Sequence, residues 1–138
     1  MMNNSYQQYK NTQIETASQE KLLLMLYDGA IRFTKRAIKG IEEENYELKN
    51  NALNRVQAIL SEFQATLDHE QDPELTANLD ALYDYMNRRL IEGNVENNTE
   101  PIEEVLDMLQ ELRETWQQAA NKLKEERKER SQGISVEG

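Results

Sequence analysis

The organisation of this chain is decided by one stretch near its N-terminus, Thr16-Ala-Ser-Gln-Glu-Lys-Leu-Leu-Leu-Met-Leu-Tyr-Asp-Gly-Ala-Ile-Arg-Phe33. The stretch opens with a helix-start signal, because Ser18 can cap the first turn and Glu20 complements the positive end of the helix dipole. Six apolar or aromatic residues follow without a break, from Leu22 to Tyr27. At about 100° per residue, such a run covers every face of a helix. The helix is therefore either central in the fold, or it keeps apolar surface for a partner.

Apolar residues recur at helical spacing in the rest of the chain too. Pro73 ends one helical stretch, since a proline disfavours helical geometry at the preceding Asp72. Asn98 or Thr99 is the candidate cap of the last helix, with Pro101 in its permissive first turn. The predicted helices span residues 19–43, 46–67, 74–94 and 100–127. Short connections between four amphipathic helices predict an all-α fold, an antiparallel up-down four-helix bundle.

The two ends of the chain differ in composition from this helical part. The N-terminal residues are polar apart from Tyr6, Tyr9 and Ile14. They form either a disordered tail or a flexible arm whose tyrosines rest on apolar surface of the bundle. The C-terminal residues are too polar to stay ordered. The predicted organisation is an N-terminal arm (1–17), a bundle (18–127) and a disordered C-terminal tail (128–138).

Composition excludes several classes of protein. The absence of cysteine rules out disulfide frameworks, thiolate catalysis and cysteine-based metal centres, and it fits a cytoplasmic location. A net charge of −10 repels nucleic acid and anionic bilayers. The longest apolar run, Leu22 to Tyr27, is far shorter than the roughly 20 residues that a membrane span needs. The N-terminus lacks the basic and apolar regions of a secretion signal.

Catalysis finds little support in the sequence. The single histidine, His69, could suggest a histidine phosphotransfer bundle. Such a domain presents its histidine in mid-helix, whereas His69 lies at a predicted helix end among carboxylates that would repel phosphate. One histidine, with Thr66 three residues before it, cannot build a di-iron site. We therefore expect no enzymatic activity, no catalytic or metal-binding residues and no cofactor.

Binding is the remaining class of function. The unusual features are the excess of apolar residues from Leu22 to Tyr27, and Tyr85 and Ile91, which point away from the core stripe of their helix. One interpretation is a groove between helices that receives amphipathic helical segments of a partner. The alternative is a structural helical bundle with no client, in which these side chains are ordinary core or surface residues.

Five strings in the chain occur together in one known family. They are Tyr6-Gln-Gln-Tyr9, Thr16-Ala-Ser18, Leu24-Met-Leu-Tyr-Asp-Gly-Ala-Ile31, Leu82-Tyr-Asp-Tyr-Met-Asn-Arg-Arg-Leu90 and Glu114-Thr-Trp116. In this order, over about residues 6 to 125, the sequence resembles the FliS family of flagellin secretion chaperones. One departure is Gln19, where the family often has a proline that makes the helix start rigid.

The resemblance implies a cytoplasmic chaperone that binds the C-terminal, polymerisation-forming segment of flagellin. Such a chaperone prevents premature filament assembly and delivers flagellin to the flagellar type III export gate. The resemblance also implies that the N-terminal arm covers part of the binding surface until flagellin displaces it. Tyr6 and Tyr9 match arm positions that, in some members, dock onto the membrane protein of the export gate.

The same strings supply the candidate binding residues. They are Tyr6, Tyr9 and Ile14 in the arm, Leu24, Tyr27, Asp28 and Ile31 in the first predicted helix, and Tyr85, Arg88, Arg89 and Ile91 in the third. Alternatively, Asp28 pairs with the two arginines across the bundle. We expect Leu24, Tyr27 and Ile31 to be partly exposed, or covered only by residues 1–17. Leu82, Met86 and Trp116 are expected in the core, and an exposed groove could favour weak homo-oligomers without client.

Overall fold

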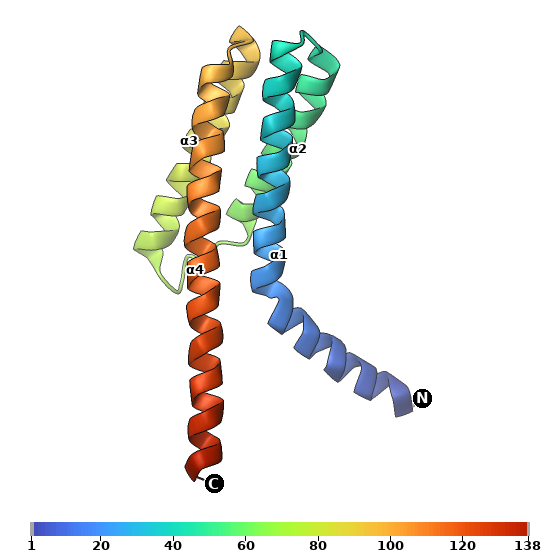
Figure 1. The fold of residues 1–138 in the computed structure, drawn as a ribbon, viewed down its shortest axis with the longest axis vertical. Helices are drawn as coiled ribbons and strands as arrows, with labels where there is room; N and C mark the ends of the chain where they lie inside the picture. The colour runs from blue at the N-terminus through green and yellow to red at the C-terminus, as the bar shows by residue number, and fades with distance from the viewer. Residues whose placement is uncertain (1, 138) are drawn as a thin grey trace. The chain divides into compact units, whose positions relative to one another are not determined.

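All four expected helices are present in the computed structural model, which describes the backbone of residues 2–137 and the side chains of residues 19–132. They are α1 (Met2–Glu42), α2 (Tyr46–Ala65), α3 (Pro73–Glu96) and α4 (Thr99–Glu137), labelled in Figure 1. Two units can be distinguished along the chain. The central unit runs from Tyr27 to Glu111, and the terminal unit contains the chain up to Leu26 and from Leu112.

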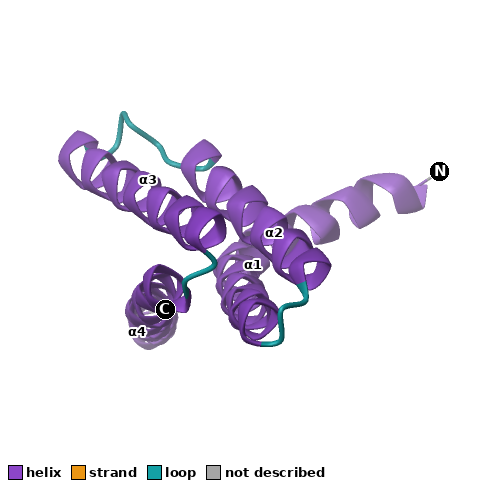
Figure 2. Ribbon diagram, turned by 90° about the horizontal axis from the view of Figure 1, so that it is seen from above, coloured by secondary structure: helices purple, strands orange, loops and turns teal. Residues whose placement is uncertain are grey.

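The central unit is an antiparallel four-helix bundle. It combines the C-terminal part of α1, all of α2 and α3, and the N-terminal part of α4. Each short connection reverses the chain, so consecutive helices run in opposite directions (Figure 1). Seen from above, the helices of this unit lie around a common centre (Figure 2). The predicted fold class is therefore confirmed.

Apolar side chains at spacings of three and four residues fill the centre of this bundle. On α2, for example, Val56, Leu60 and Phe63 are buried together on the inner face. The buried apolar side chains among the described residues are Tyr27, Ala30, Ala37, Ala52, Leu53, Val56, Leu60, Phe63, Tyr83, Met86, Leu90, Pro101, Ile102, Val105 and Leu109. All four helices contribute to this core.

Three aromatic rings from three helices meet inside it. Tyr27 of α1 stacks on Phe63 of α2, with ring centroids 4.3 Å apart. The Phe63 ring also packs against the Tyr83 ring of α3, with ring centroids 5.5 Å apart. The hydroxyl oxygens of Tyr27 and Tyr83 lie 2.8 Å apart and form a hydrogen bond. Each hydroxyl group thereby gains a partner, and burying it without one would cost free energy. Burial raises the pKa of Tyr83, although the bond to Tyr27 opposes this shift.

A buried lysine, Lys49, connects the start of α2 to the end of α3 at one end of the bundle. The Lys49 ammonium donates to Asn97 Oδ1 at 2.6 Å and to the Asn94 carbonyl oxygen at 3.3 Å. Lys49 lies in the first turn region of α2, which Asn45 caps by accepting a hydrogen bond from the Leu48 N–H. Asn97 ends α3 in the left-handed conformation, with φ of 50°. The Lys49 side chain therefore links the first turn of α2 to the C-terminal end of α3.

Glycines allow close helix contacts at the same end. A Cβ added to Gly40 would lie 2.7 Å from the backbone nitrogen of Lys49, which is closer than real Cβ atoms approach. A Cβ on Gly93 would lie 2.6 Å from Ile102 Cγ1. Gly29 is different, because its added Cβ would meet Ile59 Cδ1 at an ordinary contact distance of 3.6 Å.

The helix ends differ from the sequence predictions. The expected start of the first helix at Gln19, capped by Ser18, is wrong, since α1 is continuous from Met2. Gln19 has the backbone N–H that a proline lacks, so nothing there forces a helix to begin. Helix α4 continues past Arg127 to Glu137, through a segment rich in the helix formers Glu, Lys and Arg. The division into arm, bundle and tail stays a prediction.

Smaller differences affect the other boundaries. Helix α2 ends at Ala65 rather than near Leu67, and α3 continues to Glu96 rather than ending at Asn94. At the start of α4, Asn98 accepts a hydrogen bond from the Glu100 N–H at 3.0 Å. This bond selects Asn98 from the two candidate caps.

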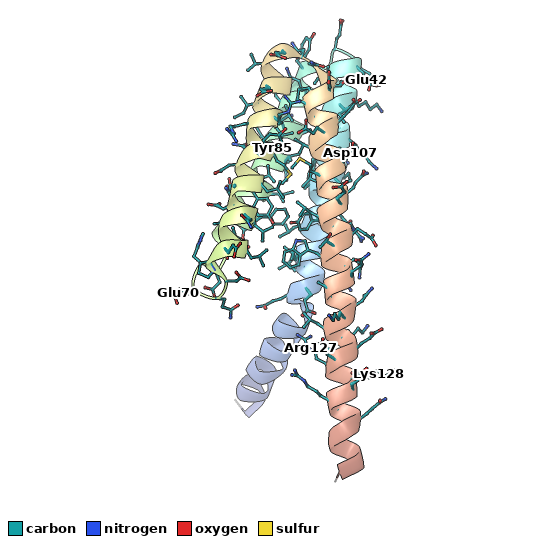
Figure 3. The ribbon with its side chains drawn as sticks, turned by 90° about the vertical axis from the view of Figure 1, so that its left-hand side faces the viewer. Glu42, Glu70, Tyr85, Asp107, Arg127 and Lys128 are labelled. Atoms are coloured by element: carbon teal, nitrogen blue, oxygen red, sulfur yellow. The ribbon has the colours of Figure 1, made fainter. Side chains whose placement is uncertain are left out.

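The terminal unit packs less tightly. None of its described side chains, in residues 19–26 and 112–132, is fully buried. Leu23 of α1 and Trp116 of α4 are half-buried. An ion pair joins its two helical segments, with Arg127 Nη2 3.0 Å from Glu20 Oε1; Arg127 is labelled in Figure 3. Two helical segments alone provide too few neighbours to enclose an apolar face.

Candidate functional site

One exposed stripe of α3 is charged in its N-terminal half and aliphatic in its C-terminal half. Asp84, Arg88, Ile91 and Val95 lie at positions i, i+4, i+7 and i+11, which share one face of a helix. We call this stripe the α3 surface. Ile91 is 45% exposed and Val95 77% exposed, so the C-terminal half of the stripe presents aliphatic side chains to solvent. These residues are available to a partner without any rearrangement of the bundle.

A hollow lies beside the N-terminal half of the α3 surface. Its volume is about 500 Å³, and it is lined by Ala81, Asp84, Asn87 and Arg88. The lining combines one small apolar side chain with an amide and charges of both signs. An amphipathic partner could therefore place apolar residues on Ile91 and Val95 and polar residues in the hollow.

Next to the α3 surface, a polar network joins α3 to α4. The Tyr85 hydroxyl, labelled in Figure 3, donates to Glu104 Oε1. Arg89 donates to Glu104 Oε2 at 3.1 Å and to Glu92 Oε2 at 2.5 Å. The hydrogen bond from Tyr85, helped by the charge of Arg89, lowers the pKa of Glu104. The same bond raises the pKa of Tyr85.

The terminal unit carries a second apolar surface. Leu22 and Met25 of α1 are 56% and 58% exposed, and Leu123 of α4 is 42% exposed. A separate hollow of about 80 Å³ is lined by Glu20, Leu23, Trp116, Ala119, Ala120 and Leu123. We call this the terminal-unit hollow. Its lining is almost entirely apolar, so it suits an aliphatic or aromatic side chain.

The predicted binding residues of α1 have different surroundings. Leu24 and Ile31 are partly exposed, as expected. Asp28 is exposed. The expectation for Tyr27 is wrong, because its side chain is fully buried and contacts Phe63 and Tyr83 of the bundle. The physical reason is that a tyrosine can be buried when another hydroxyl satisfies its own.

The structure brings the predicted residues of α3 together on one helix. Tyr85, Arg88 and Ile91 are exposed, whereas Arg89 is half-buried and contacts the carboxylates of Glu92 and Glu104. Of the expected core residues, Met86 is fully buried, and Leu82 and Trp116 are only half-buried. The arm positions Tyr6, Tyr9 and Ile14 lie outside the residues whose side chains the structure describes.

Six exposed large apolar residues were missed as candidates. They are Leu22, Met25, Tyr46, Leu75, Val95 and Leu123. Val95 could have been found from its i+4 spacing to Ile91, but the helix was expected to end before it. Leu22 and Met25 belong to the unbroken apolar run from Leu22 to Tyr27, in which spacing alone does not distinguish the solvent face of the helix from its core face.

No catalytic or metal centre emerges in the part of the chain that the structure describes. His69 is exposed in the turn between α2 and α3 and not in mid-helix. Among the described residues, no cluster of three or more His, Cys, Asp and Glu side chains could hold a metal ion. Within the same residues, none of the helices has an apolar stretch long enough to cross a bilayer.

Comparison with known proteins agrees with the strings in the sequence. The family model described as "Flagellar protein FliS" matches residues 2–123. The chain belongs to the FliS family. The flagellar secretion chaperone FliS of Bacillus subtilis is 38% identical over 127 residues, which cover 92% of this chain and 92% of the relative.

Two further bacterial relatives are similar to this chain. The flagellar secretion chaperone FliS of Salmonella typhimurium is 37% identical over 110 residues, covering 79% of this chain and 82% of that protein. Its counterpart in Campylobacter jejuni is 36% identical over 122 residues, covering 88% and 95%. The family consists of flagellar secretion chaperones, which are not enzymes. The family resemblance seen in the sequence is confirmed.

Proposed function

We propose that this chain is a cytoplasmic export chaperone for flagellin. In this proposal it binds the C-terminal polymerisation segment of flagellin, prevents premature filament assembly and delivers the subunit to the flagellar type III export gate. Membership of the FliS family supports the chaperone role. The observation that carries the binding mode is the solvent exposure of Ile91 and Val95 on the α3 surface.

The physical basis is coupled folding and binding. A segment that folds only within a filament is unfolded beforehand and exposes the apolar side of an amphipathic helix. The α3 surface and the terminal-unit hollow each offer apolar area of the kind such a helix buries. Burying an Ile or Val side chain contributes about 1.5–3 kcal/mol, so a few such contacts offset the entropy lost when the segment becomes ordered.

The direct test mixes the purified chain with its cognate flagellin and measures the complex by size-exclusion chromatography with light scattering. We expect a stable complex of one chain of each. Flagellin without its C-terminal segment is the control and should not bind. Equal binding of the truncated flagellin would contradict the proposed mode. The same column reports whether the client-free protein forms the predicted weak homo-oligomer.

A matched pair of variants tests the α3 surface. The double variant Ile91→Glu/Val95→Glu places two charges where the client is proposed to bury apolar side chains. We expect the dissociation constant for flagellin, measured by calorimetry, to rise at least about tenfold, which corresponds to 1.4 kcal/mol. The control Asn50→Glu/Asn54→Glu adds the same charge at the same spacing on exposed positions of α2. If both variants bind like the wild type, the client groove lies elsewhere.

The N-terminal arm is proposed to report the loaded state. Tyr6 and Tyr9 would lie on apolar surface in the empty chaperone and engage the gate protein once flagellin is bound. The variant Tyr6→Ala/Tyr9→Ala should lose binding of the loaded complex to the cytoplasmic domain of the gate protein. Unchanged affinities for both flagellin and the gate would contradict this role.

One variant separates the chaperone from a phosphotransfer protein. His69→Ala should leave flagellin binding and swimming motility unchanged, because His69 is exposed in a turn away from the α3 surface. A phosphotransfer protein would lose all function with this change. A client-free structural bundle would instead form no flagellin complex in any of these experiments.

A further inference from the structure

A basic face interrupts the acidic surface of this chain. Arg32, Lys35, Arg36 and Lys39 lie at positions i, i+3, i+4 and i+7 of α1, so they share one side of the helix. All four are exposed, and no acidic residue lies between Asp28 and Glu42 in the sequence. Arg55 of α2 is also exposed and joins them. We call these five residues the basic face. The whole chain has a net charge of −10, so this concentration of cations is a local exception.

Three of the cations lie around one half-buried aromatic ring, that of Phe33. The guanidinium carbons of Arg32 and Arg36 each lie 5.3 Å from the centroid of the Phe33 ring, and that of Arg55 lies 5.6 Å from it. Among the residues that the structure describes, none of these three guanidiniums forms an ion pair with a carboxylate. Lys39 differs, since its ammonium lies 3.9 Å from Glu43 Oε1.

A hollow opens between these cations. Its volume is about 170 Å³, and its lining consists of Phe33, Arg36, Leu48, Asn51, Ala52 and Arg55. Phe33, Leu48 and Ala52 provide an apolar wall, while Arg36, Asn51 and Arg55 provide hydrogen-bond donors. This is the composition of a recognition pocket, in which apolar contact is combined with a few polar groups that fix orientation.

The charges in this pocket are not balanced by the chain itself. Guanidiniums within 5.6 Å of one point are at most about 11 Å apart, and charge screening at physiological salt acts over about 8 Å. Their mutual repulsion is therefore only partly screened. An arriving carboxylate relieves this repulsion, and the planar guanidinium binds carboxylates with two parallel hydrogen bonds.

We propose that the basic face binds an acidic amphipathic helix of a partner protein. The four cations of α1 span two helical turns, about 10.5 Å, which matches carboxylates at positions i, i+3 or i+4, and i+7 of a partner helix. An apolar side chain of that helix enters the hollow against Phe33, Leu48 and Ala52. The site uses neither the α3 surface nor the terminal-unit hollow, so it operates beside the proposed flagellin sites and independently of them.

Other anionic partners fit the molecule less well. A net charge of −10 repels every anionic partner at long range, and this repulsion grows with the charge of the partner. It therefore disfavours nucleic acid, anionic bilayers and a second copy of this chain more than a short helix with a few carboxylates. Membrane-surface helices insert large exposed apolar side chains, whereas Phe33 at the centre of the basic face is half-buried. A short acidic helix brings complementary charge together with a single apolar side chain for the hollow.

The test is an NMR titration of the full-length ¹⁵N-labelled chain with a synthetic peptide. The probe is the acetylated and amidated peptide Glu-Ala-Ala-Glu-Leu-Ala-Ala-Glu-Ala-Ala, which places three glutamates and one leucine on the same helix face, and its counterpart has glutamine at every glutamate. We expect the acidic peptide to shift the amide signals of Phe33, Leu48 and Asn51 and the Nε–H signals of Arg36 and Arg55. A dissociation constant of about 1 mM or below is expected for so short a helix.

Matched variants establish which cations are responsible. Arg36→Gln/Arg55→Gln should weaken peptide binding at least tenfold, while Lys128→Gln/Arg130→Gln makes the same change of net charge on exposed residues outside the basic face and should leave binding unchanged. Arg36→Lys keeps the positive charge but removes the bidentate hydrogen bonding of the guanidinium group. It should therefore weaken peptide binding by a smaller factor than Arg36→Gln/Arg55→Gln does. Thermal melts confirm that each variant folds.

Several outcomes would overturn the proposal. They are the absence of shifts at the basic face at millimolar peptide, equal binding of the glutamine peptide, and unchanged binding by Arg36→Gln/Arg55→Gln. Equal shifts with inorganic phosphate would indicate a general anion site, and preferential binding of phosphatidylserine vesicles would indicate a membrane site. A salt-sensitive dimer abolished by Arg36→Gln/Arg55→Gln would assign the face to a second copy. Loss of flagellin binding in the earlier tests would leave this proposal intact.

Discussion

The central unit buries fifteen apolar side chains, whereas none of the described side chains of the terminal unit is fully buried. The apolar content of the sequence does not explain this difference. Five of the six residues of the longest apolar run, Leu22 to Leu26, belong to the terminal unit, and two of them are more than half exposed. In the central unit, single apolar residues such as Val56 are enclosed because four helices surround them.

The two units differ in stability and in how readily they can accept a partner. A side chain becomes core only when neighbours cover it from several directions, and two helical segments cannot do this for a helix that is apolar all round. The central unit is therefore the scaffold that holds the α3 surface in a fixed shape. The terminal unit has few buried contacts and keeps apolar surface, which is characteristic of segments that open locally and accept a partner.

The largest expected effect is a difference between two truncations, one in each unit. Phe63 lies between Tyr27 and Tyr83 and is 2% exposed, so Phe63→Ala should lower the free energy of unfolding by about 3–5 kcal/mol. Leu123 is 42% exposed, and Leu123→Ala should lower it by about 0.5 kcal/mol or less. Urea unfolding followed by far-ultraviolet circular dichroism measures both. Equal losses would break the distinction between the units.

A smaller effect, of opposite sign at two sites, is expected from two glycines of α1. Gly40→Ala should lower the free energy of unfolding by about 1–3 kcal/mol, because its Cβ would lie 2.7 Å from backbone of α2 that cannot rotate away. Gly29→Ala should raise it by about 0.5–1 kcal/mol, since the helix gains propensity and the new methyl group meets Ile59 at 3.6 Å. Thermal melts of the two variants, which carry the same chemical change, give the sign directly. Destabilisation by both would show that the packing around Gly29 is tighter than 3.6 Å implies.

The smallest effect concerns the surface of the central unit and depends on pH. The hydrogen bond from Tyr85 lowers the pKa of Glu104 below its ordinary value of 4.5. The carboxylate therefore stabilises the folded chain above pH 4.5, and this contribution is lost as pH falls through the lowered pKa. The difference in free energy of unfolding between wild type and Glu104→Gln should be present at pH 7 and shrink on acidification below pH 4.5. In a Tyr85→Phe background, the difference should already be smaller at pH 7, and an unchanged difference would exclude Tyr85 as the main cause.

Much of the fold follows from local patterns in the sequence. The inner face of α2 is set by residues at spacings of three and four, and Val56, Leu60 and Phe63 are buried as that pattern predicts. Pro73 and Asn98 mark the starts of α3 and α4, and both act on the backbone within a few residues of their own positions. The exposure of Tyr85 and Ile91 was also predicted, because both point away from the core stripe of their helix.

The remaining features depend on partners that are distant in the sequence. Tyr27 is buried because its hydroxyl meets that of Tyr83, 56 positions away, and no local pattern reveals this pairing. Arg89 contacts Glu104 because of the relative rotation of α3 and α4, which helical spacing within α3 does not contain. The basic face was overlooked for the same reason, since Arg55 joins the cations of α1 only when α1 and α2 pack together.

Trp116 gives the terminal unit an optical consequence. It is the only tryptophan in the sequence, and it lines the terminal-unit hollow while remaining partly open to solvent. Intrinsic fluorescence therefore reports the wetting of that hollow, while the tyrosine-rich core of the central unit contributes no indole signal. A side chain that enters the hollow would displace water from the indole and move its emission to shorter wavelength. The fluorescence of Trp116 therefore indicates whether the terminal-unit hollow is occupied, without any added label.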